Sequence, residues 1–117
     1  MSKSLDATLS IVEKTYQIYK RLVVINTKIP DIHRPDLGRQ CLNTTETLLQ
    51  TFFMAQYAPK THKGAYLLKA QSQLDILNLQ LRLYLDLKLA NETKIFQLLS
   101  DSQEVGRMLG GWLKSST

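Results

Sequence analysis

The sequence predicts an all-α fold, specifically an antiparallel up-down-up-down four-helix bundle. Apolar residues recur at helical spacing in four long segments, and prolines or polar residues separate these segments. The connectors are short, which favours antiparallel packing of neighbouring helices. The expected helices cover residues 5–27, 35–58, 63–89 and 92–114 of one domain, residues 1–117.

The third segment carries the strongest pattern. Residues 79–89 alternate leucine with mostly polar residues, as a strand would, but leucine is a strong helix former and no β-branched residue is present. One helical stripe contains Leu67, Ala70, Leu74, Leu77, Leu81, Leu85 and Leu89. A second stripe contains Ile76, Leu79, Leu83 and Leu87. A helix with two apolar stripes must be covered on two sides, so we expect another subunit on one of them.

The first segment also has two apolar stripes. One contains Leu5, Leu9, Val12, Tyr16, Tyr19 and Val23, and the other contains Ile11, Ile18, Leu22 and Ile25. We expect the first of these stripes to face the bundle core and the second to face another subunit. This interpretation gives two of the four helices a surface for self-association.

Prolines and polar residues set the expected helix boundaries. Pro30 stops the first helix, Pro35 occupies the first turn of the second, and Pro59 ends the second. Residues 61–64 are expected to form a short basic turn, and Asn91 is a candidate N-cap for the fourth helix.

Glycines are concentrated in the fourth segment, at Gly106, Gly110 and Gly111. Each costs about 1 kcal/mol relative to alanine inside a helix. Two readings remain open: small residues allow another backbone to approach closely, or the helix frays at this point.

Composition indicates a globular cytoplasmic protein. Of the 117 residues, 44% are hydrophobic and 21% are charged. No apolar run approaches the ~20 residues of a membrane span, and the N-terminus has no hydrophobic signal core. Cys41 stands alone, which fits a reducing compartment, and its place in an apolar pattern predicts a buried thiol.

Motifs for catalysis are absent from the sequence. His33 and His62 lie in expected turns and lack the Glu-x-x-His spacing of di-iron bundles. No Cys/His cluster has zinc spacing, and there is no glycine-rich phosphate loop. Asp101 and Glu104 share a helix face that we interpret as solvated. We expect no catalytic residue, no metal site and no cofactor.

Basic residues are the better indication of function. The net charge is +5, and Lys14, Arg21 and Lys28 recur every seven residues, as do Arg107 and Lys114. Such rows suit a phosphate backbone or an acidic protein surface, although they also keep an apolar helix soluble. The candidate nucleic-acid or partner contacts are Lys14, Lys20, Arg21, Lys28, Arg39, Lys60, Lys63, Arg107 and Lys114.

Three stretches resemble a known family. The most specific is residues 104–114, with the string Gly-Arg-Met-Leu-Gly-Gly-Trp, and residues 30–39 and 81–88 agree as well. The sequence resembles Avd, the accessory variability determinant of diversity-generating retroelements, over nearly its whole length. The wider group also contains four-helix-bundle proteins encoded within intervening sequences of ribosomal RNA genes.

The resemblance implies a non-catalytic, basic four-helix bundle that assembles into a barrel-like homopentamer. It also implies association with a reverse transcriptase and its template RNA during mutagenic synthesis of complementary DNA. Five copies of a +5 chain would carry +25. The expected oligomer interface comprises Ile11, Ile18, Leu22, Ile25, Ile76, Leu79, Leu83 and Leu87. Alternatives are a structural or RNA-binding role of the ribosomal intervening-sequence type, and a small-molecule or metal enzyme.

Overall fold

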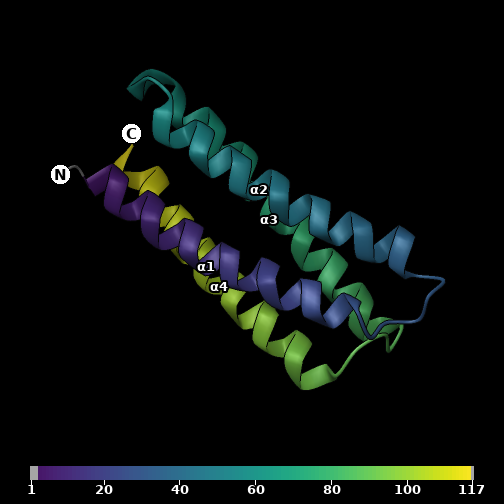
Figure 1. The fold of residues 1–117 in the computed structure, drawn as a ribbon. Coiled ribbons are helices and arrows are strands. Elements are labelled where there is room, and N and C mark those ends of the chain that lie inside the picture. The colour runs from purple at the N-terminus through teal and green to yellow at the C-terminus, as the bar shows by residue number, and fades with distance from the viewer. Residues whose placement is uncertain (1–2, 117) are drawn as a thin grey trace.

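Four helices pack into a bundle 44 × 23 × 20 Å in extent. The computed structural model describes residues 3–116 and the side chains of residues 7–116. The elements are α1 (Lys3–Asn26), a π-helical turn η1 (Arg34–Gly38), α2 (Arg39–Tyr57), α3 (Lys60–Asp86) and α4 (Glu92–Ser115). Consecutive helices run in opposite directions, so α1 begins and α4 ends at the same end of the bundle (Figure 1). The predicted all-α bundle is confirmed.

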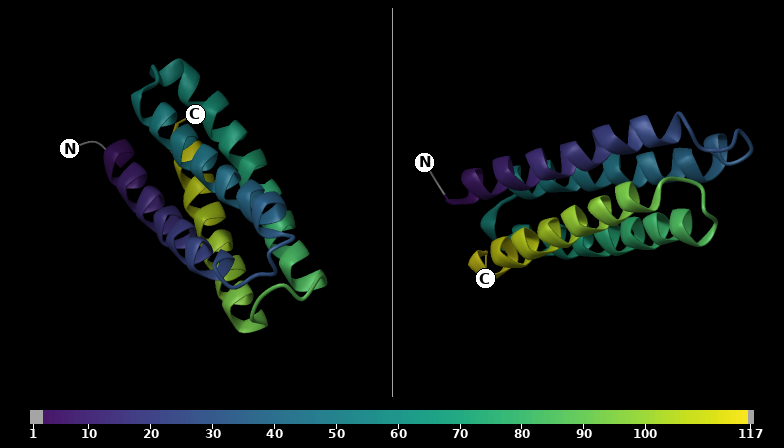
Figure 2. Two further views of the ribbon diagram at one scale, coloured as in Figure 1. Left: turned by 45° about the vertical axis from the view of Figure 1, so that its right-hand side comes forward. Right: turned by 90° about the horizontal axis from the view of Figure 1, so that it is seen from below.

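Each helix packs against two neighbours. Helix α1 contacts α2 and α4, and α3 contacts the same two helices. Figure 2 shows this arrangement from two further directions. The bundle therefore has four sides, each formed by one pair of adjacent helices. The α1/α2 side lies opposite the α3/α4 side, and the α1/α4 side lies opposite the α2/α3 side.

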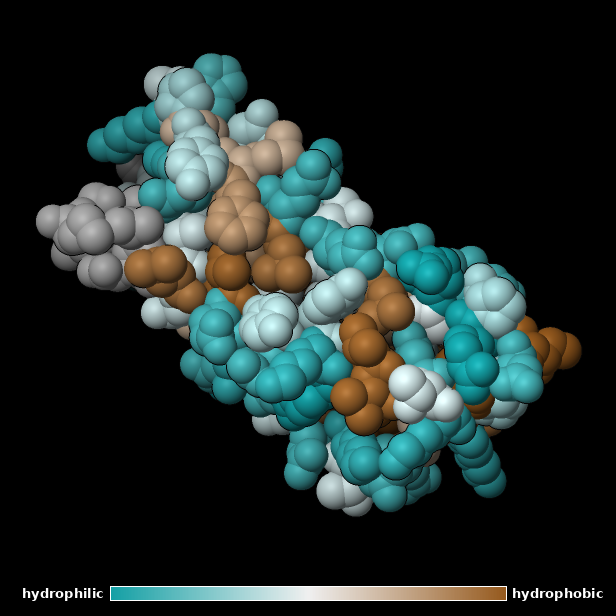
Figure 3. Space-filling model, viewed as in Figure 1, coloured by the Kyte–Doolittle hydropathy of each residue, from teal (hydrophilic) through white to brown (hydrophobic). Residues whose placement is uncertain are grey.

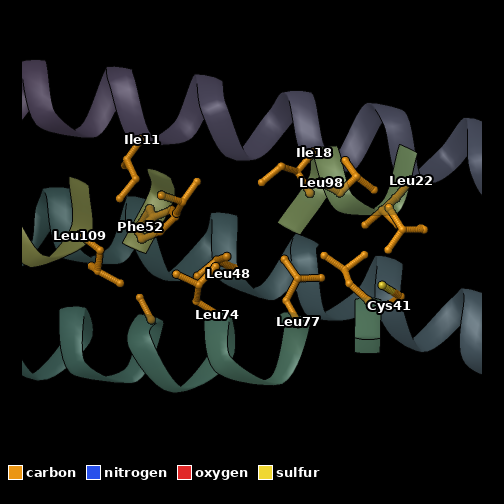
Figure 4. Packing of buried hydrophobic residues seen from close by; sticks show 14 of the residues in the cluster. Ile11, Ile18, Leu22, Cys41, Leu48, Phe52, Leu74, Leu77, Leu98 and Leu109 are labelled. Atoms are coloured by element: carbon orange, nitrogen blue, oxygen red, sulfur yellow. The ribbon is translucent and has the colours of Figure 1, made fainter. Parts of the chain in front are cut away.

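The core is a continuous layer of aliphatic and aromatic side chains from all four helices (Figure 4). The fully buried members include Ile11, Ile18, Leu22, Cys41, Leu48, Phe52, Leu74, Leu77 and Leu98. Phe52 and Trp112 add an aromatic contact with ring centroids 6.3 Å apart. Burial of these side chains is the main source of the bundle's stability.

The two apolar stripes of α1 have the opposite roles to those predicted. The four α1 residues expected at a subunit interface are core residues: Ile11, Ile18, Leu22 and Ile25. Leu9, Tyr16 and Val23 of the other stripe are exposed instead, and the Leu5 side chain lies outside the described residues. The reason is that the all-aliphatic stripe carries no polar atom, whereas a tyrosine hydroxyl must keep a partner or water when buried.

The two stripes of α3 are placed as predicted relative to the core. Leu67, Ala70, Leu74, Leu77 and Leu81 are buried, whereas Ile76, Leu79, Leu83 and Leu87 are each 40–60% exposed. The outer stripe is therefore available to a partner. Its use in subunit contacts stays a prediction.

Residues 61–64 form the first turn of α3, so the prediction of a separate turn there is wrong. The Lys63 ammonium donates to the carbonyl oxygens of Ala55 and Gln56, both at 2.8 Å. These are carbonyls of the last turn of α2, which have no intrahelical partner. A lysine in the first turn of α3 thus caps the preceding helix, and the connector shrinks to residues 58–59.

An asparagine ties the end of α1 to α2 and α3. The Asn26 amide donates to the Gly38 carbonyl at 3.0 Å, and the Tyr84 hydroxyl donates to Asn26 Oδ1 at 2.5 Å. A Cβ at position 38 would lie 3.2 Å from Ile29 Cδ1, so glycine permits this close approach. The Arg34 guanidinium donates to the carbonyl of the last residue of α1 and to two carbonyls just beyond it. This end of the bundle is fixed by polar contacts as well as by packing.

Helix α3 ends in a Schellman motif. The Leu89 amide donates to the Tyr84 carbonyl at 2.9 Å, and the Lys88 amide donates to the Leu85 carbonyl at 3.1 Å. Lys88 has a φ of 54°, the left-handed conformation that glycine adopts more readily. Leu89 is buried beyond this turn and anchors it to the core.

We expect Lys88→Gly to raise the free energy of unfolding by about 0.5–1 kcal/mol. The variant removes the Cβ strain of the left-handed position, and the added freedom of the unfolded chain offsets only part of that gain. Urea denaturation measures the difference. Lys88→Ala is the control, because it removes the same charge but keeps a Cβ; an equal gain in both variants would assign the effect to charge.

Candidate nucleic-acid interface

The α1/α4 side brings two members of the heptad-spaced basic row against α4. Lys14 Nζ lies 3.3 Å from Asp101 Oδ1, and the Arg21 guanidinium donates to the other carboxylate oxygen. Asp101 is therefore bound by two cations from α1 and is only 24% exposed. The interpretation of Asp101 as part of a solvated face is wrong. The Asp101 carboxylate links α4 to α1 through these two ion pairs and neutralises one of the two positive charges.

Opposing effects act on the pKa of the Asp101 carboxyl. Partial burial raises the pKa by penalising the charged form, but hydrogen bonds and charge from Arg21 and Lys14 outweigh that effect. The net pKa lies below the ordinary aspartate value. These ion pairs therefore stabilise the fold fully at pH values above the ordinary aspartate pKa. The stabilisation is lost as the pH falls through the lowered pKa of Asp101.

We expect Asp101→Asn to lower the free energy of unfolding by about 1 kcal/mol at neutral pH, a modest value because both cations are partly exposed. The difference from wild type should shrink below the ordinary aspartate pKa and vanish at still lower pH. Urea denaturation over a pH series measures it. A difference that stays constant with pH would show that the carboxylate charge does not stabilise the bundle.

Two adjacent depressions continue the α1/α4 side toward the connector end of the bundle. Their volumes are about 220 and 160 Å³, and they share Val24, Ile25 and Lys94. The first also has Lys20 and Arg21 on its wall, and the second has Lys28. Neither depression has an acidic residue in its lining. We call this surface the basic groove and define it by Lys20, Arg21, Lys28 and Lys94, with Val24 between them.

Lys94 is a groove residue that the sequence analysis missed. It lies in the first turn of α4, where the Asn91 side chain accepts a hydrogen bond from its backbone N–H at 3.1 Å. This N-cap was predicted. Since the predicted antiparallel order places the start of α4 beside the end of α1, Lys94 could have been paired with Lys28 from the sequence. A seven-residue spacing relates residues of one helix only, so it does not reveal a cluster that joins Lys94 of α4 to the lysines at the end of α1.

The remaining basic candidates lie outside the groove. Lys63 caps α2, and Lys60 begins α3 at the opposite end of the bundle from Lys28. Arg107 pairs with Glu104 on α4. Arg39 begins α2, and Lys114 lies in the last turn of α4. The structure therefore brings together Lys20, Arg21 and Lys28 of the nine candidates, and Lys14 lies about two turns before them on α1.

No arrangement for catalysis is found among the side chains that the structure describes, those of residues 7–116. His33 lies at the α1–α2 connector and His62 at the other end of the bundle, so they do not share a site. Within the described part of the chain, no group of three His, Cys, Asp or Glu residues could hold a metal ion. Burial raises the pKa of the Cys41 thiol to about 12, with a smaller opposing effect from Tyr84, so this thiol is protonated at neutral pH.

Comparison with known proteins identifies the family. A family model described as bAvd-like matches residues 9–116, which is nearly the whole chain. The chain belongs to the bAvd-like family. A search of curated proteins finds no match.

Family membership confirms the resemblance drawn from the sequence. It suggests an accessory protein of a diversity-generating retroelement, a class that is generally non-catalytic. Family membership also implies association with the reverse transcriptase of such an element. Within residues 3–116, none of the helices combines the length and hydropathy needed to cross a membrane.

Proposed function

We propose that this chain is a non-catalytic accessory protein that binds the reverse transcriptase and template RNA of a diversity-generating retroelement, and thereby supports mutagenic synthesis of complementary DNA. The observation that supports RNA binding is the basic groove, where four cations from α1, the turn that follows it and α4 line adjoining depressions without an acidic residue. Family membership supports the retroelement context.

The groove cations suit a phosphate backbone. Among the described side chains, no ion pair within 4 Å joins Lys20, Lys28 or Lys94 to a carboxylate. Their charge is therefore available to phosphates, and binding would release the counterions condensed on the RNA. Val24, which is 53% exposed between them, offers an apolar surface to a sugar or base.

Assembly of several copies would strengthen RNA binding, because a single chain carries a net charge of only +5. We propose that the protein forms a homopentamer, in which five basic grooves act together and the formal charge reaches +25. The reverse transcriptase is the second proposed partner, drawn to the same positive field. A modest charge per chain is then sufficient for RNA binding, because an RNA strand that spans several grooves gains affinity from each of them.

The test is charge reversal in the groove. The triple variant Lys20→Glu, Lys28→Glu, Lys94→Glu should weaken binding of template RNA at least tenfold in fluorescence anisotropy at moderate salt. The slope of log affinity against log salt should flatten by about 2, because roughly three phosphate contacts to a single strand are lost. Copurification with the reverse transcriptase should weaken as well.

The matched control is the triple variant Lys60→Glu, Lys69→Glu, Arg82→Glu. It reverses the same number of charges at exposed positions of α3, none of which lines the groove. If both triples weaken RNA binding equally, net charge rather than the groove determines affinity. Unchanged binding by the groove variant would refute the proposed site.

A further inference from the structure

An open depression of about 330 Å³ lies where α2 passes into α3, at the end of the bundle opposite the α1–α2 connector. Its lining is mainly aromatic and apolar, contains no carboxylate, and comprises Met54, Tyr57, Ala58, Pro59, His62 and Tyr66. In Figure 3, which has the view of Figure 1, hydrophobic atoms reach the surface beside hydrophilic ones at this end of the bundle. We call this depression the tyrosine pocket.

The tyrosine pocket presents rings and a thioether that the bundle does not bury. Among the described side chains, no large apolar one is more exposed than Tyr57, at 81%. Met54, one turn before it on α2, is 39% exposed. Tyr and Met are enriched in protein–protein interfaces, and a tyrosine ring supplies a large contact area at little cost in conformational entropy. The Tyr57 ring is therefore available to a partner without loss to the core.

The walls of the tyrosine pocket are held in place by the turn itself. The connector is only residues 58–59, and the ring of Pro59 restricts its backbone. The Lys63 ammonium joins the start of α3 to the last carbonyls of α2, and the Thr61 hydroxyl lies 3.0 Å from Nδ1 of His62. Binding here would require little ordering of this chain, which favours affinity.

The charge around the tyrosine pocket is positive. Residues 47–74 contain no aspartate or glutamate. Lys60 directly follows Pro59 and is exposed, and among the described side chains no ion pair within 4 Å joins it to a carboxylate. Lys63 adds a second cation, whose ammonium donates to backbone carbonyls. A partner segment that carries carboxylates beside an apolar side chain complements this surface.

The chemistry of the tyrosine pocket differs from that of the basic groove and favours protein over RNA. The groove lining has four cations and no aromatic residue, which suits a phosphate backbone. The tyrosine pocket has one exposed cation at its edge, and Met54, Ala58 and Pro59 offer no planar surface for stacking of bases. The two ends of the bundle therefore suit two different partners.

We propose that the tyrosine pocket is the docking site for the reverse transcriptase. A segment of the enzyme places one large apolar side chain in the depression and an aspartate or glutamate beside Lys60. The positive field of the protein attracts the enzyme at long range, and the pocket supplies the specific contact. The inference rests on the reverse-transcriptase part of the proposed function and not on RNA binding.

The test measures binding of purified, ribonuclease-treated reverse transcriptase to the immobilised protein by biolayer interferometry. Tyr57→Ala should weaken binding by about tenfold or more, because it removes the exposed ring. Tyr57→Phe should bind like wild type, since the ring rather than the hydroxyl makes the contact. Lys60→Glu should also weaken binding, because it places a carboxylate beside the acidic segment of the enzyme. Circular dichroism checks that each variant folds, as expected for exposed positions.

Two controls separate the tyrosine pocket from other surfaces. Ile32→Ala removes an apolar side chain that is 78% exposed at the other end of the bundle, and it should leave binding of the enzyme unchanged. Tyr57→Ala and Lys60→Glu should keep the wild-type affinity for template RNA in fluorescence anisotropy. Crosslinking through p-benzoylphenylalanine in place of Tyr57 then identifies the bound segment, which should contain an acidic residue next to a large apolar one.

Three outcomes would overturn the proposed docking site. Wild-type affinity of Tyr57→Ala for the enzyme would show that the ring makes no contact. Crosslinking of position 57 to template RNA instead of the enzyme would assign the pocket to nucleic acid. A wild-type protein that does not bind the enzyme at all would refute this site together with the reverse-transcriptase part of the proposed function, whereas the first two outcomes leave that part intact.

Discussion

Replacement of Ile18 by alanine is expected to lower the free energy of unfolding by about 3 kcal/mol. The side chain is fully buried among residues from the other helices, so truncation loses its transfer free energy and leaves a cavity. Urea denaturation followed by circular dichroism measures the change. The slope of the transition should stay the same, because the surface exposed on unfolding does not change appreciably.

Ile32→Ala is the matched control for that measurement. The substitution is identical, but Ile32 is 78% exposed, and the expected change is within about 0.5 kcal/mol. Ile18 belongs to the α1 stripe that the sequence analysis placed at a subunit contact. If Ile18→Ala left stability intact and reduced the mass of the assembly, the sequence-based placement would be right and the burial described above would be wrong.

The second large effect is expected from Asn26→Ala, at about 2–4 kcal/mol. The variant removes the hydrogen bonds to the Gly38 carbonyl and from the Tyr84 hydroxyl. Both groups would remain buried without their partner, and each buried unsatisfied group costs about 1–3 kcal/mol. Thermal or urea denaturation measures the loss.

A double-mutant cycle separates the hydrogen bond from packing. Tyr84→Phe removes the hydroxyl but keeps the ring, which is fully buried. We expect a coupling energy of about 1 kcal/mol or more between Asn26→Ala and Tyr84→Phe, because the second change removes the group that the first leaves unpaired. Additive effects would show that the hydroxyl and the amide do not depend on each other.

Helix number and most helix ends were predictable because their signals are local. Pro59 and Asn91 lie directly before the first residues of α3 and α4, and Pro30 lies four residues after the last residue of α1. The start of α3 was missed because its signal is not local. Lys63 belongs to α3 but binds carbonyls of α2, a contact that appears only once the two helices pack together.

The roles of the two α1 stripes were not decided by periodicity, because both stripes have helical spacing. Residue type carried the missing signal. Ile11, Ile18 and Leu22 have no polar atom, whereas the competing stripe includes Tyr16 and Tyr19, which keep a hydroxyl near water or a partner. On α3 both stripes are mainly leucine, and the continuous stripe that begins upstream at Leu67 was assigned to the core as observed.

The candidate binding site was predictable only in part. The basic row of α1 was visible from sequence, but the effect of Asp101 on Lys14 and Arg21 was not, since the three residues meet only across two helices. The same geometry explains why Lys94 was missed. A row on one helix predicts a charged face, whereas the charge that a ligand meets depends on the neighbouring helix.

The central proposal is that copies of the chain join through exposed apolar residues, such as Leu79 and Leu83 on the outer stripe of α3. The mass of the wild-type protein in solution tests it most directly, measured by sedimentation equilibrium at micromolar concentration. We predict a homopentamer of five times 13.4 kDa, with the same mass for the variant in which Lys20, Lys28 and Lys94 are reversed. A wild-type protein that sediments as a single 13.4 kDa chain would contradict the account.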